Sequence, residues 1–174
     1  IPAAGKGSRF KKEQWKSPKP FIDINGKYMI QNVIENLNID NSKKILIFRS
    51  EHFLNSNFKN QINQDFDIIL LDALTEGTAC TVLSAFDKIN SDNPLLIANS
   101  DQIVDFDCQD FVDDCHNRHL DASILVFKDP NKSTKWSYAK VNNYGLVTEV
   151  KEKVPISELA TVGIYYFAKG KDFV

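Results

Sequence analysis

The stretch Leu95-Leu96-Ile97-Ala98-Asn99-Ser100-Asp101 decides the fold, because a short apolar run passes directly into a polar end. Unbroken apolar residues over such a length are typical of a strand that is buried on both faces of a sheet. The segments Lys44–Phe48 and Asp67–Leu71 have the same character and also predict buried strands. Open parallel sheets bind ligands where their strands end, so residues 99–101 mark a candidate crevice.

Helical patterns separate these predicted strands. Tyr28–Leu37 carries an apolar stripe that predicts an amphipathic helix. Asp107, with Asp110 behind it, predicts the N-cap of a helix that runs through Cys115. Two more helices are predicted from apolar residues three or four positions apart, namely Leu54, Phe58 and Ile62, and then Val82, Phe86 and Ile89. This alternation implies a mostly parallel sheet covered by helices.

The last third of the chain has a different pattern, with strands that follow one another directly. The strands predicted from Ile124 onward are Ile124–Phe127, Ser137–Val141, Leu146–Lys151 and Thr161–Phe167. The sheet is therefore expected to be mixed, within one α/β domain that spans residues 1–174. Because the chain opens on Ile1 and ends at Val174, we expect the first part of strand 1 and a C-terminal portion to lie outside it.

Composition limits the classes of function. The chain has 174 residues, which fits one domain of roughly 100–200 residues. Its net charge of −2, from 21 basic and 23 acidic residues, argues against a nucleic-acid or membrane partner. No apolar run approaches the roughly 18 residues of a membrane span. Three cysteines, an odd number without metal-type spacing, indicate reduced thiols and a cytoplasmic protein.

The glycine-rich segment at the amino terminus is the first candidate for chemistry. It is Ala3-Ala4-Gly5-Lys6-Gly7-Ser8-Arg9, directly after the end of a predicted strand. Glycines let backbone N–H groups close around a phosphate, and the cations of Arg9 and Lys19 suit phosphate oxygens. The spacing differs from a P-loop, and Phe10 stands where the dinucleotide fingerprint has a third small residue. An ordinary turn with solvated Lys and Arg side chains stays open as the alternative.

Asp101 is the second candidate, as a ligand for Mg²⁺. It follows a predicted strand, at the place where a cation can be held by one or two carboxylates and by substrate phosphates. The alternative for Asp101 is a turn or capping residue. Asp105-Phe106-Asp107 also has the form of an Asp-x-Asp metal motif, although Asp107 is better explained as the helix cap and Asp105 as a solvated residue. His116 and His119 have no third ligand near them in sequence, which favours surface histidines.

Several motifs, in their order along the chain, resemble those of the sugar-phosphate nucleotidyltransferases (the nucleoside-diphosphate-sugar pyrophosphorylases). These motifs are Ala4-Gly5-Lys6-Gly7-Ser8-Arg9-Phe10, Ser17-Pro18-Lys19-Pro20-Phe21-Ile22, Asp23–Ile30, Thr75-Glu76-Gly77-Thr78-Ala79-Cys80-Thr81, Leu96–Asp101, Val150-Lys151-Glu152-Lys153 and Thr161-Val162-Gly163-Ile164-Tyr165. The resemblance covers nearly the whole chain. It implies a Rossmann-like three-layer α/β/α nucleotidyltransferase fold with a mixed, mostly parallel central sheet. It also implies a member of the bacterial capsule or lipopolysaccharide type.

The resemblance further implies an enzyme of the pyrophosphorylase type that uses Mg²⁺. Such an enzyme joins a nucleoside triphosphate to a small phosphorylated acceptor, a sugar 1-phosphate or another cell-envelope precursor phosphate, and releases pyrophosphate. Arg9 and Lys19 are then the catalytic cations, and Asp101 is the metal ligand. The implied nucleotide-binding residues are Ala3, Ala4, Gly5, Gly7, Ser8, Asp72, Glu76 and Gly77, and the implied acceptor-binding residues are Lys153, Glu152 and Tyr138. The family's second metal carboxylate normally lies on a later strand, beyond Val174. Assembly of the protein as a homo-oligomer stays open.

Asp72 bears on the choice of base. In thymidylyl- and uridylyltransferases of this kind, an amide side chain at the equivalent place contacts the base. An ionised carboxylate only accepts hydrogen bonds, so Asp72 suits the exocyclic amine of cytosine and favours CTP, unless it merely ends the strand. Two alternatives from other classes stay open. One is a GT-A glycosyltransferase, which would use Asp105 and Asp107 for a metal, and the other is a non-catalytic, nucleotide-binding regulatory relative.

Overall fold

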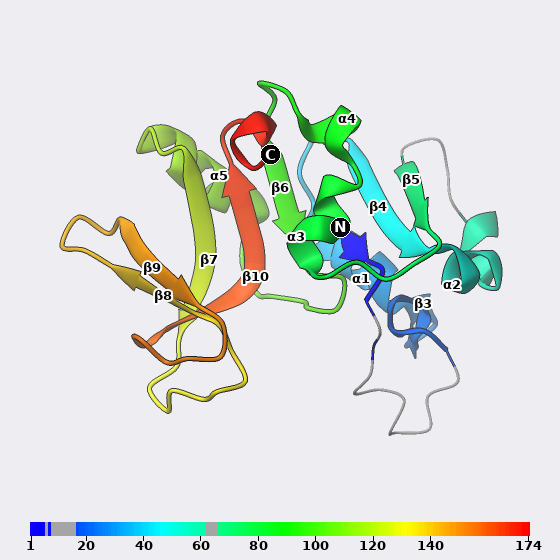
Figure 1. Cartoon of the computed structure of the whole chain (residues 1–174), viewed down its shortest axis with the longest axis horizontal. Helices are drawn as coiled ribbons and strands as arrows, with labels where there is room; N and C mark the ends of the chain where they lie inside the picture. The colour runs from blue at the N-terminus through cyan, green and yellow to red at the C-terminus, as the bar shows by residue number, and fades with distance from the viewer. Residues whose placement is uncertain (6, 8–16, 62–65) are drawn as a thin grey trace.

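A parallel sheet forms the first part of the molecule. The computed structural model describes residues 1–5, 7, 17–61 and 66–174. Its parallel strands lie in the order β1, β4, β5, with bounds β1 (Pro2–Ala3), β4 (Lys44–Arg49) and β5 (Phe66–Leu71). The register places Pro2 opposite Ile47 and Lys44 opposite Phe66. The carboxyl ends of these strands therefore share one edge of the sheet (Figure 1).

An antiparallel sheet forms the second part. Its strands are β6 (Leu95–Ala98), β7 (Ala122–Lys128), β8 (Tyr138–Val141), β9 (Val147–Lys151) and β10 (Leu159–Phe167). The long strand β10 pairs with β6, β7 and β8, and β8 pairs in turn with β9. A small hairpin of β2 (Asp23–Ile24) and β3 (Lys27–Tyr28) precedes the first helix. The predicted mixed α/β fold is confirmed, with parallel pairing among β1, β4 and β5 and antiparallel pairing in the β2–β3 hairpin and from β6 onward.

Helices cover both faces of the strands, which gives the three predicted layers. On one face of β4, Leu46 and Phe48 pack with helix α1 (Met29–Asn36). On the other face, Ile47 packs with α3 (Thr78–Leu83) and α4 (Phe86–Ile89). Helix α5 (Cys108–Asn117) packs beside α1 against β6 and β10. In Figure 1, α3 and α4 lie on the viewer's side of the strands, and α1 and α5 lie behind them.

Two predicted helices are shorter than the sequence pattern indicated. Helix α2 (Ser50–Leu54) ends at Leu54, which is 55% exposed, and the chain continues as the 3-10 turn η3 (Asn57–Asn60). The hydroxyl of Ser56 donates to the carbonyl of Phe53 at 2.7 Å, a local bond that competes with helix continuation. The predicted helix through Val82 and Ile89 is divided between α3 and α4 in the same way, because Ser84 Oγ donates to Thr81 O at 2.7 Å.

A hollow of about 720 Å³ lies between the two sheets, with β4 and β6 among the elements that line it. The amino group of Ile1 reaches this region and donates to Ile45 O at 2.7 Å. The expected first part of strand 1 stays a prediction. The cysteines Cys80, Cys108 and Cys115 are free thiols. Within the described ranges, each helix is too short or too polar to span a membrane.

Candidate functional site

A pocket of about 610 Å³ opens where β1, β5 and β6 end. The ends of β1 and β5 form the carboxyl edge of the parallel sheet, the place where open α/β sheets bind ligands, whereas β6, which was expected in that sheet, pairs antiparallel with β10. Its walls come from three segments that are distant in sequence: Pro2–Gly5 with Gly7, Leu74–Thr78 with Thr81, and Asn99–Asp101, together with Lys19 and Pro20. Of the predicted site residues, the pocket brings together Ala3, Ala4, Gly5, Gly7, Lys19, Glu76, Gly77 and Asp101.

The glycine loop forms one wall of this pocket. Gly7 has a φ of +57°, a left-handed conformation that glycine adopts without the steric cost of a side chain. A Cβ on Gly5 would meet no atom within 4 Å, so the backbone at Gly5 borders open space that a ligand can approach. The predicted Ser8 and Arg9 lie outside the described residues, and their roles stay predictions.

Lys19 is held at the mouth of the glycine loop by a 3-10 turn, η2 (Lys19–Phe21). Phe21 is buried in the aromatic cluster with Phe48 and Phe58, which fixes the turn against the sheet. The amide of Phe21 donates to Pro18 O at 2.8 Å. Across the pocket, Lys19 Nζ donates to the Asp101 carboxylate. The two predicted charges of the site are therefore in direct contact.

Asp101 has the surroundings expected of a magnesium ligand. Its side chain is 25% exposed at the pocket wall, and Ser100 is its neighbour in the lining. Carboxylate oxygen is the donor that Mg²⁺ prefers, and the ion is commonly held by one or two carboxylates plus substrate phosphates. In the described part of the chain, no three acidic, histidine or cysteine side chains gather as a metal cluster. The role of Asp101 as a metal ligand stays a prediction.

The turn between β5 and α3 forms the opposite wall and is rigid. Gly77 is the N-cap of α3, and its carbonyl accepts hydrogen bonds from both Thr75 Oγ1 and Thr81 Oγ1 at 3.1 Å. The two hydroxyls also contact each other at 2.6 Å. A Cβ on Gly77 would meet no atom within 4 Å, so a flat ligand could lie against this backbone.

Asp72 lies beside this turn and outside the pocket lining. Its Oδ1 accepts a hydrogen bond of 2.7 Å from Ser50 Oγ at the start of α2. The bond joins the ends of β4 and β5. The structure thus places Asp72 at the correct edge of the sheet, with one carboxylate oxygen engaged by a protein group, and its role toward a base stays a prediction.

The predicted acceptor residues lie apart from the pocket. Tyr138 is fully buried, and its hydroxyl lies 2.7 Å from both Asp129 Oδ2 and Ser133 O. Burial and the Asp129 carboxylate raise the pKa of Tyr138 to about 12, and the same hydrogen bond lowers the pKa of Asp129. Tyr138 is therefore a buried residue in this structure, in the part of β8 where Ala139 is buried as well.

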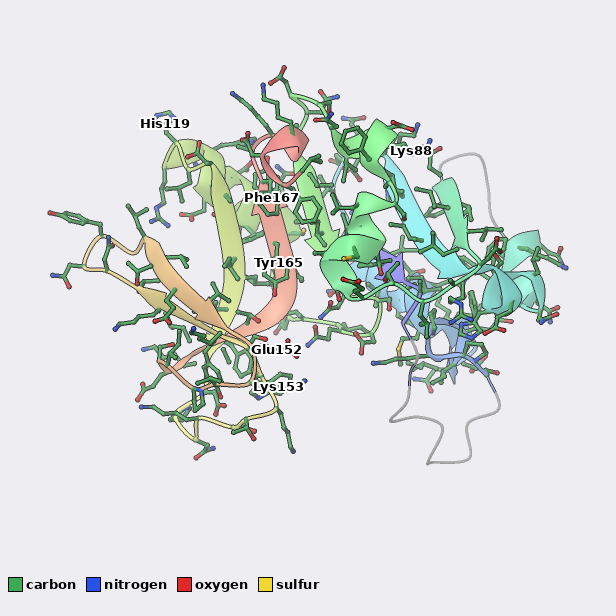
Figure 2. All side chains as sticks on the ribbon, in the orientation of Figure 1. Lys88, His119, Glu152, Lys153, Tyr165 and Phe167 are labelled. Atoms are coloured by element: carbon green, nitrogen blue, oxygen red, sulfur yellow. The ribbon has the colours of Figure 1, made fainter. Side chains whose placement is uncertain are left out.

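Glu152 and Lys153 follow β9 and are exposed. Lys153 Nζ contacts Glu152 Oε1 at 2.8 Å, and this hydrogen bond lowers the pKa of Glu152. Figure 2 shows both side chains at the lower end of β10. Lys153 has a φ of +55°, an uncommon conformation for a residue with a side chain. Such residues are enriched in turns and functional sites, which keeps Lys153 a candidate for binding.

The rival metal motifs have structural explanations. Asp107 caps α5 by accepting from the amides of Gln109 at 2.7 Å and Asp110 at 3.1 Å, as the sequence predicts. Asp105, its partner in the Asp-x-Asp pattern, lies outside the pocket lining. His116 Nε2 contacts the hydroxyl of the buried Tyr166 at 2.6 Å. Asp107 and His116 therefore have structural roles and Asp105 is exposed, which disfavours the glycosyltransferase alternative.

Asn99 lines the pocket and Gly163 supports it from β10, and sequence reasoning gave neither of them a role. Gly163 has a φ of +79° at a shift in the pairing of β10 with β7, and a Cβ there would overlap the Asn99 side chain. Asn99 N donates to Gly163 O at 3.1 Å, and Asn99 Nδ2 donates to Gln102 Oε1 at 2.8 Å. The loop that carries Asp101 is thereby anchored on β10. A glycine inside a strand pattern is a recognised signal for such a close approach.

The fold and the pocket together define the class of protein. Parallel strands that end at a glycine-rich loop are typical of α/β proteins that bind nucleotides there. The family follows from comparison of the whole chain. The chain belongs to the Nucleotidyl transferase family, whose profile matches residues 1–171. The predicted family is confirmed, and the capsule or lipopolysaccharide type stays a prediction.

Individual relatives are similar over nearly the whole chain. The bifunctional protein GlmU of Methanocaldococcus jannaschii is 30% identical over 173 residues, which are 97% of this chain and 39% of that protein. The UTP–glucose-1-phosphate uridylyltransferase AglF of Haloferax volcanii is 25% identical over 171 residues, 95% of this chain and 69% of that protein. The nucleoside-diphosphate-sugar pyrophosphorylase from Vibrio cholerae RC9 has a TM-score of 0.77 at 25% identity, over 99% of this chain and 74% of that one. The chain thus spans 39% of the length of the GlmU relatives.

Proposed function

We propose that the protein is a nucleotidyltransferase that joins a nucleoside monophosphate to a small phosphorylated acceptor. A phosphate oxygen of the acceptor attacks the α-phosphorus of a nucleoside triphosphate. The bond from this phosphorus to the oxygen that bridges to the β-phosphate breaks, and pyrophosphate leaves. The observation that carries the proposal is the contact between Lys19 and Asp101 in a pocket walled by the glycine loop.

The residues of this chain contribute position and charge, which are what a phosphoryl-type transfer needs. The backbone of Gly5 and Gly7 would hold the triphosphate, together with Arg9. The ammonium of Lys19 would neutralise charge near the α-phosphate. Asp101 would hold Mg²⁺, which neutralises phosphate charge when it is bound. Gly77 offers an open backbone surface to the base, with Glu76 beside it in the pocket lining.

A sugar 1-phosphate is the acceptor that the relatives favour. AglF is named for its action on UTP and glucose 1-phosphate. We propose an acceptor of the same chemistry that serves as a cell-envelope precursor, bound with the help of Lys153 and Glu152. Both residues are exposed at the end of β9, where a ligand could reach them.

The test is pyrophosphate release by the full-length protein with Mg²⁺, each of four nucleoside triphosphates and a panel of phosphorylated acceptors. Release that requires both an acceptor and one particular base supports the transferase. Asp101→Asn is expected to abolish release, whereas Asp105→Asn, the matched change in the rival Asp-x-Asp motif, is expected to retain it. A protein that loses activity only with Asp105→Asn contradicts the assignment of the site.

For the base, we propose a preference for CTP. Asp72 keeps Oδ2 as an acceptor while Oδ1 bonds Ser50, and an ionised carboxylate can accept from the cytosine amine. The preference is checked by comparing CTP with UTP in the same assay. Asp72→Asn, which adds an amide donor, is expected to shift use toward UTP. If the unchanged protein uses UTP as well as or better than CTP, the proposed preference for CTP is contradicted.

A further inference from the structure

The ion pair of Lys19 and Asp101 joins two groups that the proposed function assigns to different partners. Lys19 Nζ donates to Asp101 Oδ2 across 82 residues of sequence, and the two side chains are 19% and 25% exposed. The Lys19 ammonium, which the proposed function assigns to phosphate, thus contacts the Asp101 carboxylate, which it assigns to a cation. We infer that Lys19 and a divalent cation compete for Asp101, so that the cation binds tightly only when nucleotide phosphates draw Lys19 away. This inference rests on the proposed function.

The exchange needs only a side-chain movement. The backbone of Lys19 is fixed in η2, where Ile22 N donates to Lys19 O at 3.3 Å and Phe21 N donates to Pro18 O at 2.8 Å. Pro20 and Phe21, which follow directly, are buried. A lysine side chain is a flexible stem with a compact charge at its end, so its ammonium can move while the backbone stays in place.

The second position for the ammonium is close to the first. The site that a Cβ on Gly7 would occupy lies 3.6 Å from Lys19 Cβ, so the glycine loop lies beside the base of the lysine side chain. Both Gly7 and Asp101 line the same pocket. A phosphate held by the loop would therefore lie within reach of Lys19 without any change of fold.

The charges in the pocket favour binding of the cation together with the nucleotide. Among the described residues that line the pocket, the charged side chains are Lys19, Glu76 and Asp101. A cation that arrives alone must displace the ammonium, which gives up its carboxylate without gaining a phosphate. A nucleotide–cation complex supplies an anion for Lys19 and a cation for Asp101 in one event. The two ligands are then coupled, and each must raise the affinity for the other by the same factor.

The experiment uses Mn²⁺ as the probe, titrated into the full-length protein and followed by the electron paramagnetic resonance signal of the free ion. Without nucleotide, Lys19→Met is expected to bind Mn²⁺ about tenfold more tightly than the unchanged protein, within the usual range of coupling. The gain should vanish in the Lys19→Met, Asp101→Asn double variant, because the contested carboxylate is gone. Lys27→Met, which breaks the exposed Lys27–Glu35 pair of 2.8 Å outside the pocket, should match the unchanged protein.

Two results would overturn the exchange. One is unchanged Mn²⁺ affinity in both Lys19→Met and a second variant, Lys19→Gln, with folding checked by circular dichroism. The other is a gain that persists in the double variant, since a general charge effect does not need Asp101. Pyrophosphate release tests the proposed function separately. If the protein releases pyrophosphate but neither Lys19 variant gains affinity for Mn²⁺, the exchange is contradicted and the proposed function is not. If Lys19→Met gains affinity for Mn²⁺ but the protein releases no pyrophosphate, the competition is supported and the transferase is contradicted.

Discussion

The pocket at the ends of β1, β5 and β6 and the region around the β8–β9 hairpin hold their charged residues in different ways. Lys19 and Asp101 are 82 residues apart and meet with side chains 19% and 25% exposed. Lys153 and Glu152 are sequence neighbours, with side chains 66% and 75% exposed. The fold holds the first pair in place, whereas the second forms in solvent, where ion pairs contribute little to stability. The pocket is therefore the preorganised half of the molecule.

Topology explains the difference. Residues after β1 and β5 meet at one edge of the parallel sheet, and residues after β6, the edge strand of the antiparallel sheet, reach the same pocket. A hairpin brings together residues that are already close in sequence, and each residue of β9 is exposed. The proposed nucleotide site is thus assembled from segments of both sheets that are distant in sequence. The predicted acceptor residues Glu152 and Lys153 lie on an exposed surface next to β9.

The largest effect is expected from Lys19→Met. Loss of an ammonium that neutralises developing charge in a preorganised site typically lowers kcat by about 10²–10³-fold. Steady-state pyrophosphate release measures the change, and Lys27→Met serves as the control for loss of an exposed lysine pair. A kcat that stays within a factor of two or so, compared with the expected hundredfold loss, would remove Lys19 from the reaction.

Gly163→Ala tests how the Asp101 loop is anchored. A side chain at φ +79° costs roughly 1–2 kcal/mol, and here the Cβ would also overlap Asn99. We expect lower unfolding free energy and a fall in kcat/KM of about tenfold or more, since small misplacements in a site are costly. Thermal unfolding and pyrophosphate release measure the two effects.

Gly145→Ala is the matched control in the hairpin turn. Gly145 has a similar φ of +75°, and its Cβ would approach only the end of the Arg118 side chain at 3.4 Å. The unfolding free energy should fall by a similar 1–2 kcal/mol or so, while activity of the folded fraction is retained. Equal loss of activity in both variants would show that backbone strain alone, and not the contact with Asn99, accounts for the result.

Lys153→Met is expected to act more weakly and on the acceptor alone. An exposed cation that contacts a phosphate contributes a factor of roughly ten or less, by analogy with other exposed ion pairs. KM for the acceptor should rise while KM for the nucleotide stays unchanged. Initial rates over a grid of both substrates separate these constants. A rise in the KM for the nucleotide instead would indicate that Lys153 contributes to nucleotide binding and not to acceptor binding.

Asp129→Asn should affect stability alone. Hydrogen bonds from Tyr138 and from backbone amides lower the pKa of Asp129, so its contribution to stability is complete above the ordinary value of 3.8 and is lost as the pH falls through the folded-state pKa. At neutral pH the variant should melt several degrees lower. The difference in Tm should shrink as the pH falls below 3.8, with pyrophosphate release at neutral pH unchanged. A constant difference in Tm would contradict the linkage.

Local pattern was enough to predict most elements. Leu95–Ala98 forms β6 with the expected bounds, and Asp107 caps α5. Apolar spacing failed where side-chain hydroxyls compete with helical hydrogen bonds, as Ser56 does after α2 and Ser84 does after α3. The sequence contains these serines, but periodicity alone does not show to which carbonyl their hydroxyls will donate a hydrogen bond.

Individual residues of the candidate site could be predicted from the sequence, but the contacts between them could not. Both Lys19 and Asp101 could be placed near the ends of strands, while their pairing depends on how η2 packs through Phe21. Tyr138 was expected at the acceptor, yet it is fully buried and its hydroxyl donates to Asp129. Which face of a strand is buried is set by its partner strands, and these are not visible in one sequence.

The most direct measurement of the central claim is a crystal structure of the full-length protein with Mg²⁺ and a non-hydrolysable nucleoside triphosphate. We expect the triphosphate against the Gly5–Gly7 backbone, the base against Gly77, the cation on Asp101 and the Lys19 ammonium moved from Asp101 to a phosphate. A nucleotide bound elsewhere, or a Lys19–Asp101 pair that stays intact beside the bound triphosphate, would contradict this expectation.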